Sequence, residues 1–220
     1  MGSLVIWASW LLLNATCAQL ISNTAYKPDQ IIICTMTASI FAGLTNLASQ
    51  TMFSDTRSGR LSVCQPIHVV NAIMTSLAAI SGSSAYVSVT SAAFIGIVAS
   101  FGYDGATRLM NKFEIDDPMN YAQINGVGGA WGLIAIGIFH NKNGLVTTAS
   151  LNLLFKQIVY CLAAVGFAVI TSVSLWKTLK LFRLRIDHIF EVIGIDMQGN
   201  QKESKTEKRN QKNAEQKGFK

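Results

Sequence analysis

The chain has 220 residues, 50% of them apolar and only 14% charged, with a formal net charge of +6 at pH 7. Soluble domains carry about 25% charged residues, and the high apolar content argues against a disordered chain. The low charge also argues against a nucleic-acid-binding surface, in which basic residues interleave with aromatic ones. We therefore expect no nucleic-acid partner. The composition instead favours a membrane protein.

Long stretches without any Asp, Glu, Lys or Arg divide the sequence, at residues 1–26, 30–54, 61–103, 118–141 and 157–176. A helix that spans a bilayer needs about 20 predominantly apolar residues. The sequence predicts six spans, in chain order at residues 4–21, 31–53, 68–80, 87–110, 124–139 and 151–175. The third and fifth are short, which is typical of helices that face one another or a pathway rather than lipid. The predicted fold class is an all-α polytopic membrane protein.

The positions of lysine and arginine predict the orientation. The last span runs into Lys177, Lys180, Arg183 and Arg185, which the positive-inside tendency places in the cytoplasm. An even number of spans then places the N-terminus there too. Residues 1–176 carry a net charge of +1 and residues 177–220 a net charge of +5. The basic excess therefore belongs to the C-terminal tail, where it reflects topology and attraction to anionic lipid.

Composition also sets the domain boundary. Residues 197–220 have mixed charge and no apolar periodicity, so we predict a disordered, basic cytoplasmic tail after a transmembrane region at 1–196 that includes the proximal tail. The four cysteines have no metal-like spacing. We expect no metal and no cofactor.

Residues 116–132 form the most unusual segment. Asp116, Asp117 and Pro118 end the preceding element, and Pro118 suits the first turn of a new helix. Glycines then crowd a short span, at Gly126, Gly128, Gly129 and Gly132. Because glycine has no side chain, a second helix backbone can approach that face closely. A dinucleotide-binding loop would need glycine at position 131, where Trp131 stands.

With these residues the segment resembles the signature of the ammonium transporter family (Amt/Mep/Rh, on the Amt side). The tenth helix of that family carries Asp-Asp-Pro, six variable residues, His-Gly and spaced glycines. Residues 10–15 resemble the sixth helix of the family, and residues 71–110 resemble its eighth and ninth. Residues 191–196 are similar to the Gly-Leu-Asp patch of its cytoplasmic C-terminus. The resemblance runs in order over about residues 4–196.

The resemblance implies about eleven spanning helices in two inverted repeats plus a last helix, assembled as a trimer with one pore per subunit. It implies that this chain supplies the second repeat and the last helix. The implied function is transport of ammonium or ammonia across the plasma membrane, without enzymatic activity. Since a midplane site at a repeat interface needs both repeats, we expect no conduction by this chain alone.

The resemblance also assigns pathway positions, several of which are substituted. Trp10 matches the family. Leu13 stands where the family has the inner gate phenylalanine, Cys17 where it has a serine of the outer recruitment site, and Tyr121 where it has a small aliphatic residue. Asn125 occupies the position of the second pore histidine. Asn125 can hydrogen-bond but cannot titrate, and Leu13 lacks the aromatic face on which a cation can be held.

Simpler interpretations of these residues stay open. Asn125 could be an interhelical hydrogen-bonding residue that contributes about 1 kcal/mol, and Trp10 could only pack. Asp116 and Asp117 could cap a helix at the cytoplasmic face rather than touch substrate. Asp104 could pair with a neighbouring basic residue.

Alternatives for the whole chain also stay open. It could be a non-conducting subunit or interaction protein that modulates full-length transporters, through its glycines and a regulatory tail patch at Glu191, Gly194 and Asp196. It could be a half-transporter that inserts in both orientations and pairs with itself. It could also be a piece of a longer transporter.

Overall fold

In the computed structural model, which describes residues 2–21, 27–52 and 65–182, every regular element is a helix. The elements are α1 (Gly2–Ile21), α2 (Pro28–Met52), α3 (Pro66–Ser81), α4 (Val89–Lys112), the π-helical segment η2 (Ala122–Val127), α5 (Gly128–Phe139), α6 (Leu145–Thr148) and α7 (Asn152–Leu181). No strand occurs in the described ranges. The all-α prediction is confirmed.

The helices follow the predicted spans in order. Four of them are long and apolar enough to cross a bilayer, namely α2, α4, the run Ala122–Phe139 and α7, and α1 and α3 supply two shorter apolar helices. At 16 residues, α3 is about 24 Å long, which agrees with the short third span predicted from the sequence. These helices identify an integral membrane protein of the predicted class.

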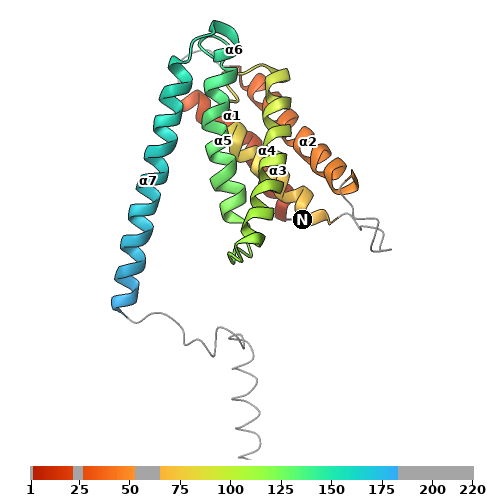
Figure 1. Cartoon of the computed structure of the whole chain (residues 1–220). Helices are drawn as coiled ribbons and strands as arrows, with labels where there is room; N and C mark the ends of the chain where they lie inside the picture. The colour runs from red at the N-terminus through yellow and green to blue at the C-terminus, as the bar shows by residue number, and fades with distance from the viewer. Residues whose placement is uncertain (1, 22–26, 53–64, 183–220) are drawn as a thin grey trace, which may run out of the picture. The chain divides into compact units, whose positions relative to one another are not determined.

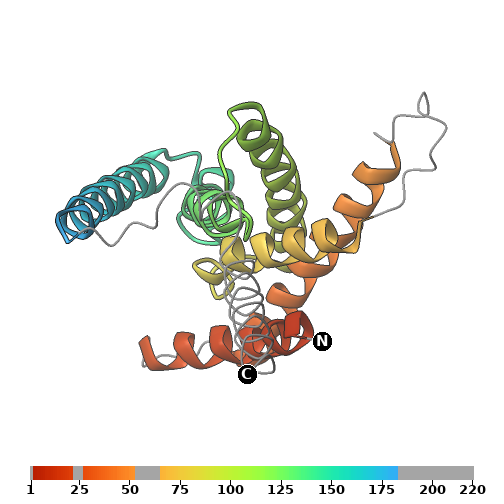
Figure 2. The ribbon, with the colours of Figure 1, turned by 90° about the horizontal axis from the view of Figure 1, so that it is seen from below.

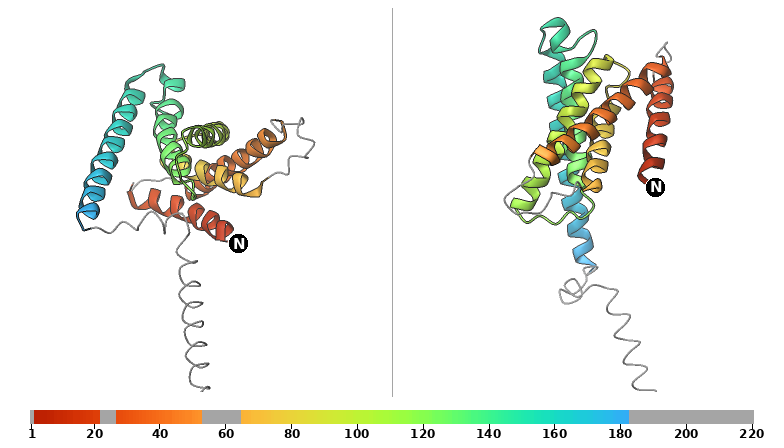
Figure 3. Two further views of the ribbon diagram at one scale, coloured as in Figure 1. Left: turned by 60° about the horizontal axis from the view of Figure 1, so that its bottom comes forward. Right: turned by 90° about the vertical axis from the view of Figure 1, so that its right-hand side faces the viewer.

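The chain divides into two compact units, residues 1–165 and 166–220. Within the first unit α3 is central, because α1, α2, α4, η2 and α5 all pack against it. Figure 1 labels the helices, and Figure 2 shows α3 in yellow with α1, α2, α4 and α5 around it. In both views of Figure 3, α1 lies at the edge of the unit. No residue of α7 is buried.

Close contacts between helix backbones depend on glycine and alanine. A Cβ atom at Gly96 of α4 would overlap the carbonyl oxygen of Ala38 in α2. A Cβ atom at Gly132 of α5 would lie 2.5 Å from the carbonyl oxygen of Ala79 in α3. The buried core around these contacts is built mostly from small side chains, including Ala92. Lipid tails are as apolar as leucine, so tight packing replaces the hydrophobic effect as the main force between such helices.

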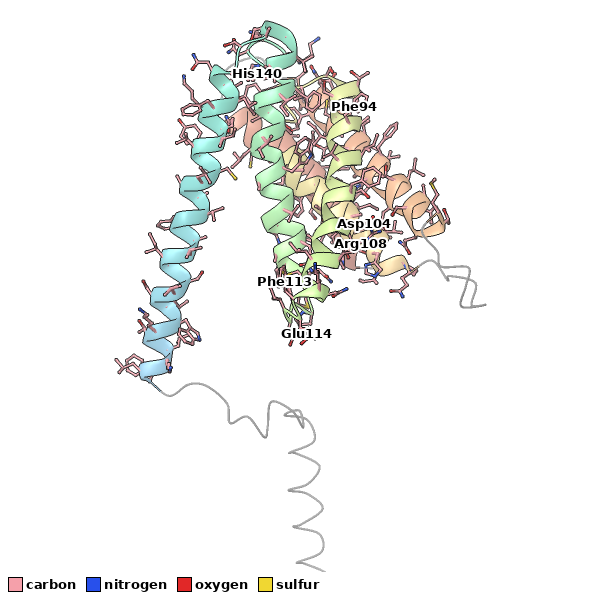
Figure 4. The ribbon with its side chains drawn as sticks, in the orientation of Figure 1. Phe94, Asp104, Arg108, Phe113, Glu114 and His140 are labelled. Carbon is pink, nitrogen blue, oxygen red and sulfur yellow. The ribbon has the colours of Figure 1, made fainter. Side chains whose placement is uncertain are left out.

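Side chains of α2 hold Asp104 of α4. The carboxylate of Asp104, the residue labelled on α4 in Figure 4, accepts hydrogen bonds from Asn46 Nδ2 at 2.7 Å and from Ser49 Oγ at 2.8 Å. Asn46 Oδ1 accepts from Gln50 Nε2 at 2.7 Å, and Gln50 Oε1 accepts from the backbone N–H of Gln65 at 2.8 Å. These bonds pair polar groups that would be costly unpaired within a membrane. They also link the end of α2 to α4 and to the start of α3.

The contact at Gly96 predicts that alanine substitutions at two glycines of α4 have very different effects on stability. A methyl group at Gly96 would push α4 away from α2, whereas a Cβ atom at Gly105 meets nothing within 4 Å. We expect Gly96→Ala to lower the free energy of unfolding by about 1–3 kcal/mol. Gly105→Ala should leave it unchanged or raise it slightly, because alanine favours a helix. Thermal unfolding in detergent, followed by circular dichroism, measures both; equal destabilisation would contradict the packing.

Candidate permeation pathway

Three predicted pathway residues, Trp10, Leu13 and Cys17, lie in α1. Their spacing of three and then four residues places them on one face of the helix. Trp10 Nε1 donates a hydrogen bond to Ser81 Oγ at the end of α3, at 2.8 Å. Leu13 is 53% exposed and Cys17 is also exposed. The structure therefore connects Trp10 to the central helix and leaves Leu13 and Cys17 uncovered.

Side-chain hydrogen bonds fix the rotation of α1 about its axis. Trp7 Nε1 donates to Ser39 Oγ at 2.9 Å, and Asn14 Nδ2 donates to Thr35 Oγ1 at 3.2 Å, both in α2. Together with Trp10, these donors recur every three or four residues and so follow one side of α1. Interhelical hydrogen bonds of this kind each contribute about 1 kcal/mol in a membrane. They determine which way the predicted pathway face points.

Tyr121 and Asn125 lie where the helix before α5 is widened. Residues Ala122–Val127 form a π-helix, a rare geometry that is frequent at functional sites. Tyr121 is 63% exposed. Asn125 is exposed, and its side chain forms no hydrogen bond with any residue in the described ranges. The amide of Asn125 is thus available to a solute or to another chain.

Gln123, in the same π-helical segment, has an environment that the sequence did not single out. It is 3% exposed, and its Nε2 donates to Asn120 Oδ1 at 3.2 Å. Its Oε1 is buried without a hydrogen-bond partner among the described residues. Buried amide oxygens are normally paired, so the unpaired Oε1 of Gln123 is an exception. A glutamine within a glycine-rich apolar helix was the only signal in the sequence.

The four glycines predicted to serve helix packing fall into two pairs. A Cβ atom at Gly128 would lie 2.7 Å from the carbonyl oxygen of Thr75 in α3, one turn from the Gly132 contact. Cβ atoms at Gly126 and Gly129 would meet nothing within 4 Å. Gly128 and Gly132 therefore form the contact between α5 and α3, and the other two leave the helix surface open.

The Asp-Asp-Pro sequence caps the start of the π-helical segment η2 and forms the turn before it. Asp117 Oδ1 accepts from the backbone N–H of Tyr121 at 3.1 Å, and Oδ2 accepts from that of Ala122 at 2.9 Å. The N–H of Asn120 donates to the Asp117 carbonyl oxygen at 3.1 Å, so Pro118 is the second residue of a turn. This differs from the prediction that Pro118 opens the helix, which begins only after the turn. Proline suits that turn position because its φ is preset.

The two groups of predicted pathway residues share one support, since α1 and the η2–α5 run both pack against α3. Their exposed groups, a thiol, a phenol and an amide, can exchange hydrogen bonds with a polar solute. None of them is an imidazole that could pass a proton near neutral pH. The described residues contain no group of three His, Cys, Asp or Glu side chains placed to hold a metal ion. The predicted tail residues Glu191, Gly194 and Asp196 lie outside the described residues.

Comparison with known proteins gives concordant matches. The model of the Ammonium Transporter Family matches residues 1–204. The chain is 34% identical over 169 residues to Ammonium transporter 1 member 2 of Arabidopsis thaliana, covering 71% of this chain and 32% of that protein. It is 26% identical over 212 residues to Ammonium transporter MEP2 of Saccharomyces cerevisiae, covering 89% of this chain and 41% of that protein.

A solved structure shares the fold. The crystal structure of Saccharomyces cerevisiae Mep2 superposes with a TM-score of 0.69 at 23% identity, covering 85% of this chain and 43% of that one. The chain spans less than half the length of each of these relatives.

The hydrogen bonds of the two carboxylates before η2 differ, so we expect their replacement by alanine to affect stability differently. Asp117 accepts two backbone N–H groups, whereas Asp116 is exposed and forms no hydrogen bond within the described ranges. We expect Asp117→Ala to lower the free energy of unfolding by about 1 kcal/mol, the usual cost of losing a capping residue. Asp116→Ala is the matched control and should have little effect. Chemical unfolding in mixed micelles compares them, and a larger loss at Asp116 would contradict the capping role.

Proposed function

The chain belongs to the ammonium transporter family, and from that premise we propose that it takes part in moving ammonium or ammonia across a membrane. The match over residues 1–204 is the observation that carries this proposal. Agreement between the α3-centred bundle and the fold of Mep2 supports it. The family consists of transporters and not of enzymes, so the proposed role involves no covalent chemistry.

The proposed substrate explains why the pathway positions matter. A bare ammonium ion in an apolar tube loses its hydration at a cost of several kcal/mol. A pathway can lower this cost by holding the cation at a polar entrance and passing the neutral base through the interior. Such a division needs groups that accept hydrogen bonds and a group that handles the proton.

This chain has only some of these groups, and we propose that it does not conduct when alone. Asn125 offers an amide that donates and accepts hydrogen bonds but does not titrate. Leu13 offers no aromatic face for a cation, and Tyr121 adds bulk. These side chains are exposed, so they have no opposite wall within the described part of the chain.

A second role has its own supporting observation. We propose as the alternative that the chain is a non-conducting subunit or interaction protein that modulates full-length ammonium transporters. The exposure of Leu13, Tyr121 and Asn125 favours it, because a second chain could cover these side chains. In this proposal the assembly is a homo- or hetero-trimer in the plasma membrane, with both termini cytoplasmic. The tail residues 191–196 would then lie on the regulatory face.

Reconstitution tests both proposals. We expect liposomes holding only this chain to show no saturable ammonium-dependent change in internal pH above protein-free liposomes. The pathway residues have no opposite wall in the described part of the chain, and none of them is an imidazole that could pass a proton near neutral pH. Stopped-flow fluorescence of an enclosed pH dye measures the internal pH, with a full-length relative as positive control. Saturable flux by the chain alone would contradict the non-conducting proposal. If the chain fails to copurify with coexpressed full-length relatives, the proposal that it is a modulating subunit is wrong.

A further inference from the structure

His140 caps the C-terminus of α5 and holds the chain that follows it. Its Nδ1 accepts hydrogen bonds from the backbone N–H groups of Lys142 at 3.0 Å and Asn143 at 3.1 Å. Its carbonyl oxygen accepts from the N–H of Gly144 at 2.9 Å and from Thr147 Oγ1 at 3.1 Å. One residue therefore fastens the loop that contains α6 to the end of α5 (Figure 4).

The same residue joins this loop to the connection between α3 and α4. The rings of His140 and Tyr86 are stacked, with centroids 5.2 Å apart and planes inclined by 19°. The N–H of Asn141 donates to the carbonyl oxygen of Tyr86 at 2.9 Å. A Cβ atom at Gly144 would lie 2.6 Å from backbone atoms of His140, so the turn closes tightly on the histidine.

The hydrogen bonds define the protonation state of the ring. A nitrogen that accepts two N–H groups must carry a lone pair, so the imidazole is neutral with its proton on Nε2. Burial lowers the pKa of His140, and the positive charge of Lys142 lowers it further. A backbone hydrogen bond acts in the opposite direction and raises the pKa. Both the geometry and the surroundings therefore favour the neutral ring.

We propose that His140 is a pH-sensitive latch that holds residues 140–149 against Tyr86 while neutral and releases them when Nδ1 is protonated. A proton on Nδ1 would turn the acceptor into a donor that faces two backbone N–H groups. The titratable and charged groups that face the ring are Tyr86 from the α3–α4 connection and Lys142 of its own loop. Figure 4 places Asp104 and Glu114 toward the opposite end of this unit.

The direction of the pH effect follows from the lowered pKa. The folded loop binds fewer protons than the released loop between the folded pKa and the ordinary histidine value of about 6.5. The contribution of the latch is therefore fully present above about pH 6.5 and is lost as the pH falls through the lowered pKa. This inference rests on the loop geometry and the lowered pKa, and it does not depend on the proposed transport function.

Hydrogen exchange of the whole chain in lipid nanodiscs tests the latch. After correction for intrinsic exchange rates, the protection of the Lys142 and Asn143 amides should fall about tenfold between neutral pH and about pH 5, because a lost hydrogen bond exposes each amide. Histidine ¹⁵N spectra at neutral pH should show the Nε2–H tautomer for His140. Constant protection across this range, or an Nδ1–H tautomer, would overturn the proposal.

Three substitutions separate the latch from a general effect of acid. His140→Asn keeps an acceptor that does not titrate, so protection should persist at every pH. His140→Phe keeps a ring against Tyr86 but no acceptor, so protection should be low throughout. His188→Asn, at a position outside the described residues, is the matched histidine control and should retain the wild-type pH response. The same pH response in His140→Asn as in the wild type would overturn the proposal.

Discussion

The approach of helix backbones at two glycines is the contact on which the rest of this structure depends. Gly96 lets α4 lie against Ala38 of α2, and Gly132 lets α5 lie against Ala79 of α3. This closeness brings polar side chains of neighbouring helices within reach, as in the 2.7 Å bond from Asn46 to Asp104. In a bilayer, where apolar burial gives little force between helices, tight packing and these hydrogen bonds together provide the stability.

The assembled bundle satisfies its polar groups on some faces and leaves others open. The first helix is tied down through Trp7, Trp10 and Asn14, which turns its Leu13 side outward. The amide of Asn125 has no partner in the described ranges. Because unpaired polar groups are expensive within lipid, such faces suit contact with a solute, with water or with another chain. The exposed faces of this chain therefore support the proposal that it provides only part of a pathway.

Most of the fold could be predicted from the sequence because each membrane span corresponds to a long apolar run without charged residues. The order of the helices and the short α3 follow from this pattern alone. The π-helical turn at Ala122–Val127 was not predicted from the sequence. The donors from α2 that hold Asp104, the amide of Asn46 and the hydroxyl of Ser49, could not be predicted either, because they come from a helix distant in the sequence. Residues 126 and 128 look alike in sequence, and only packing distinguishes them.

Thiol reactivity tests most directly whether the pathway face of α1 is uncovered in the single chain. Cys17 is exposed near the end of α1, and Cys34 is 0% exposed near the start of α2, so the two lie at similar distances from the ends of consecutive helices. In nanodiscs treated with N-ethylmaleimide, mass spectrometry should find Cys17 modified at least about tenfold faster than Cys34, because only an accessible thiol reacts. Equal rates, or faster modification of Cys34, would contradict the exposed face.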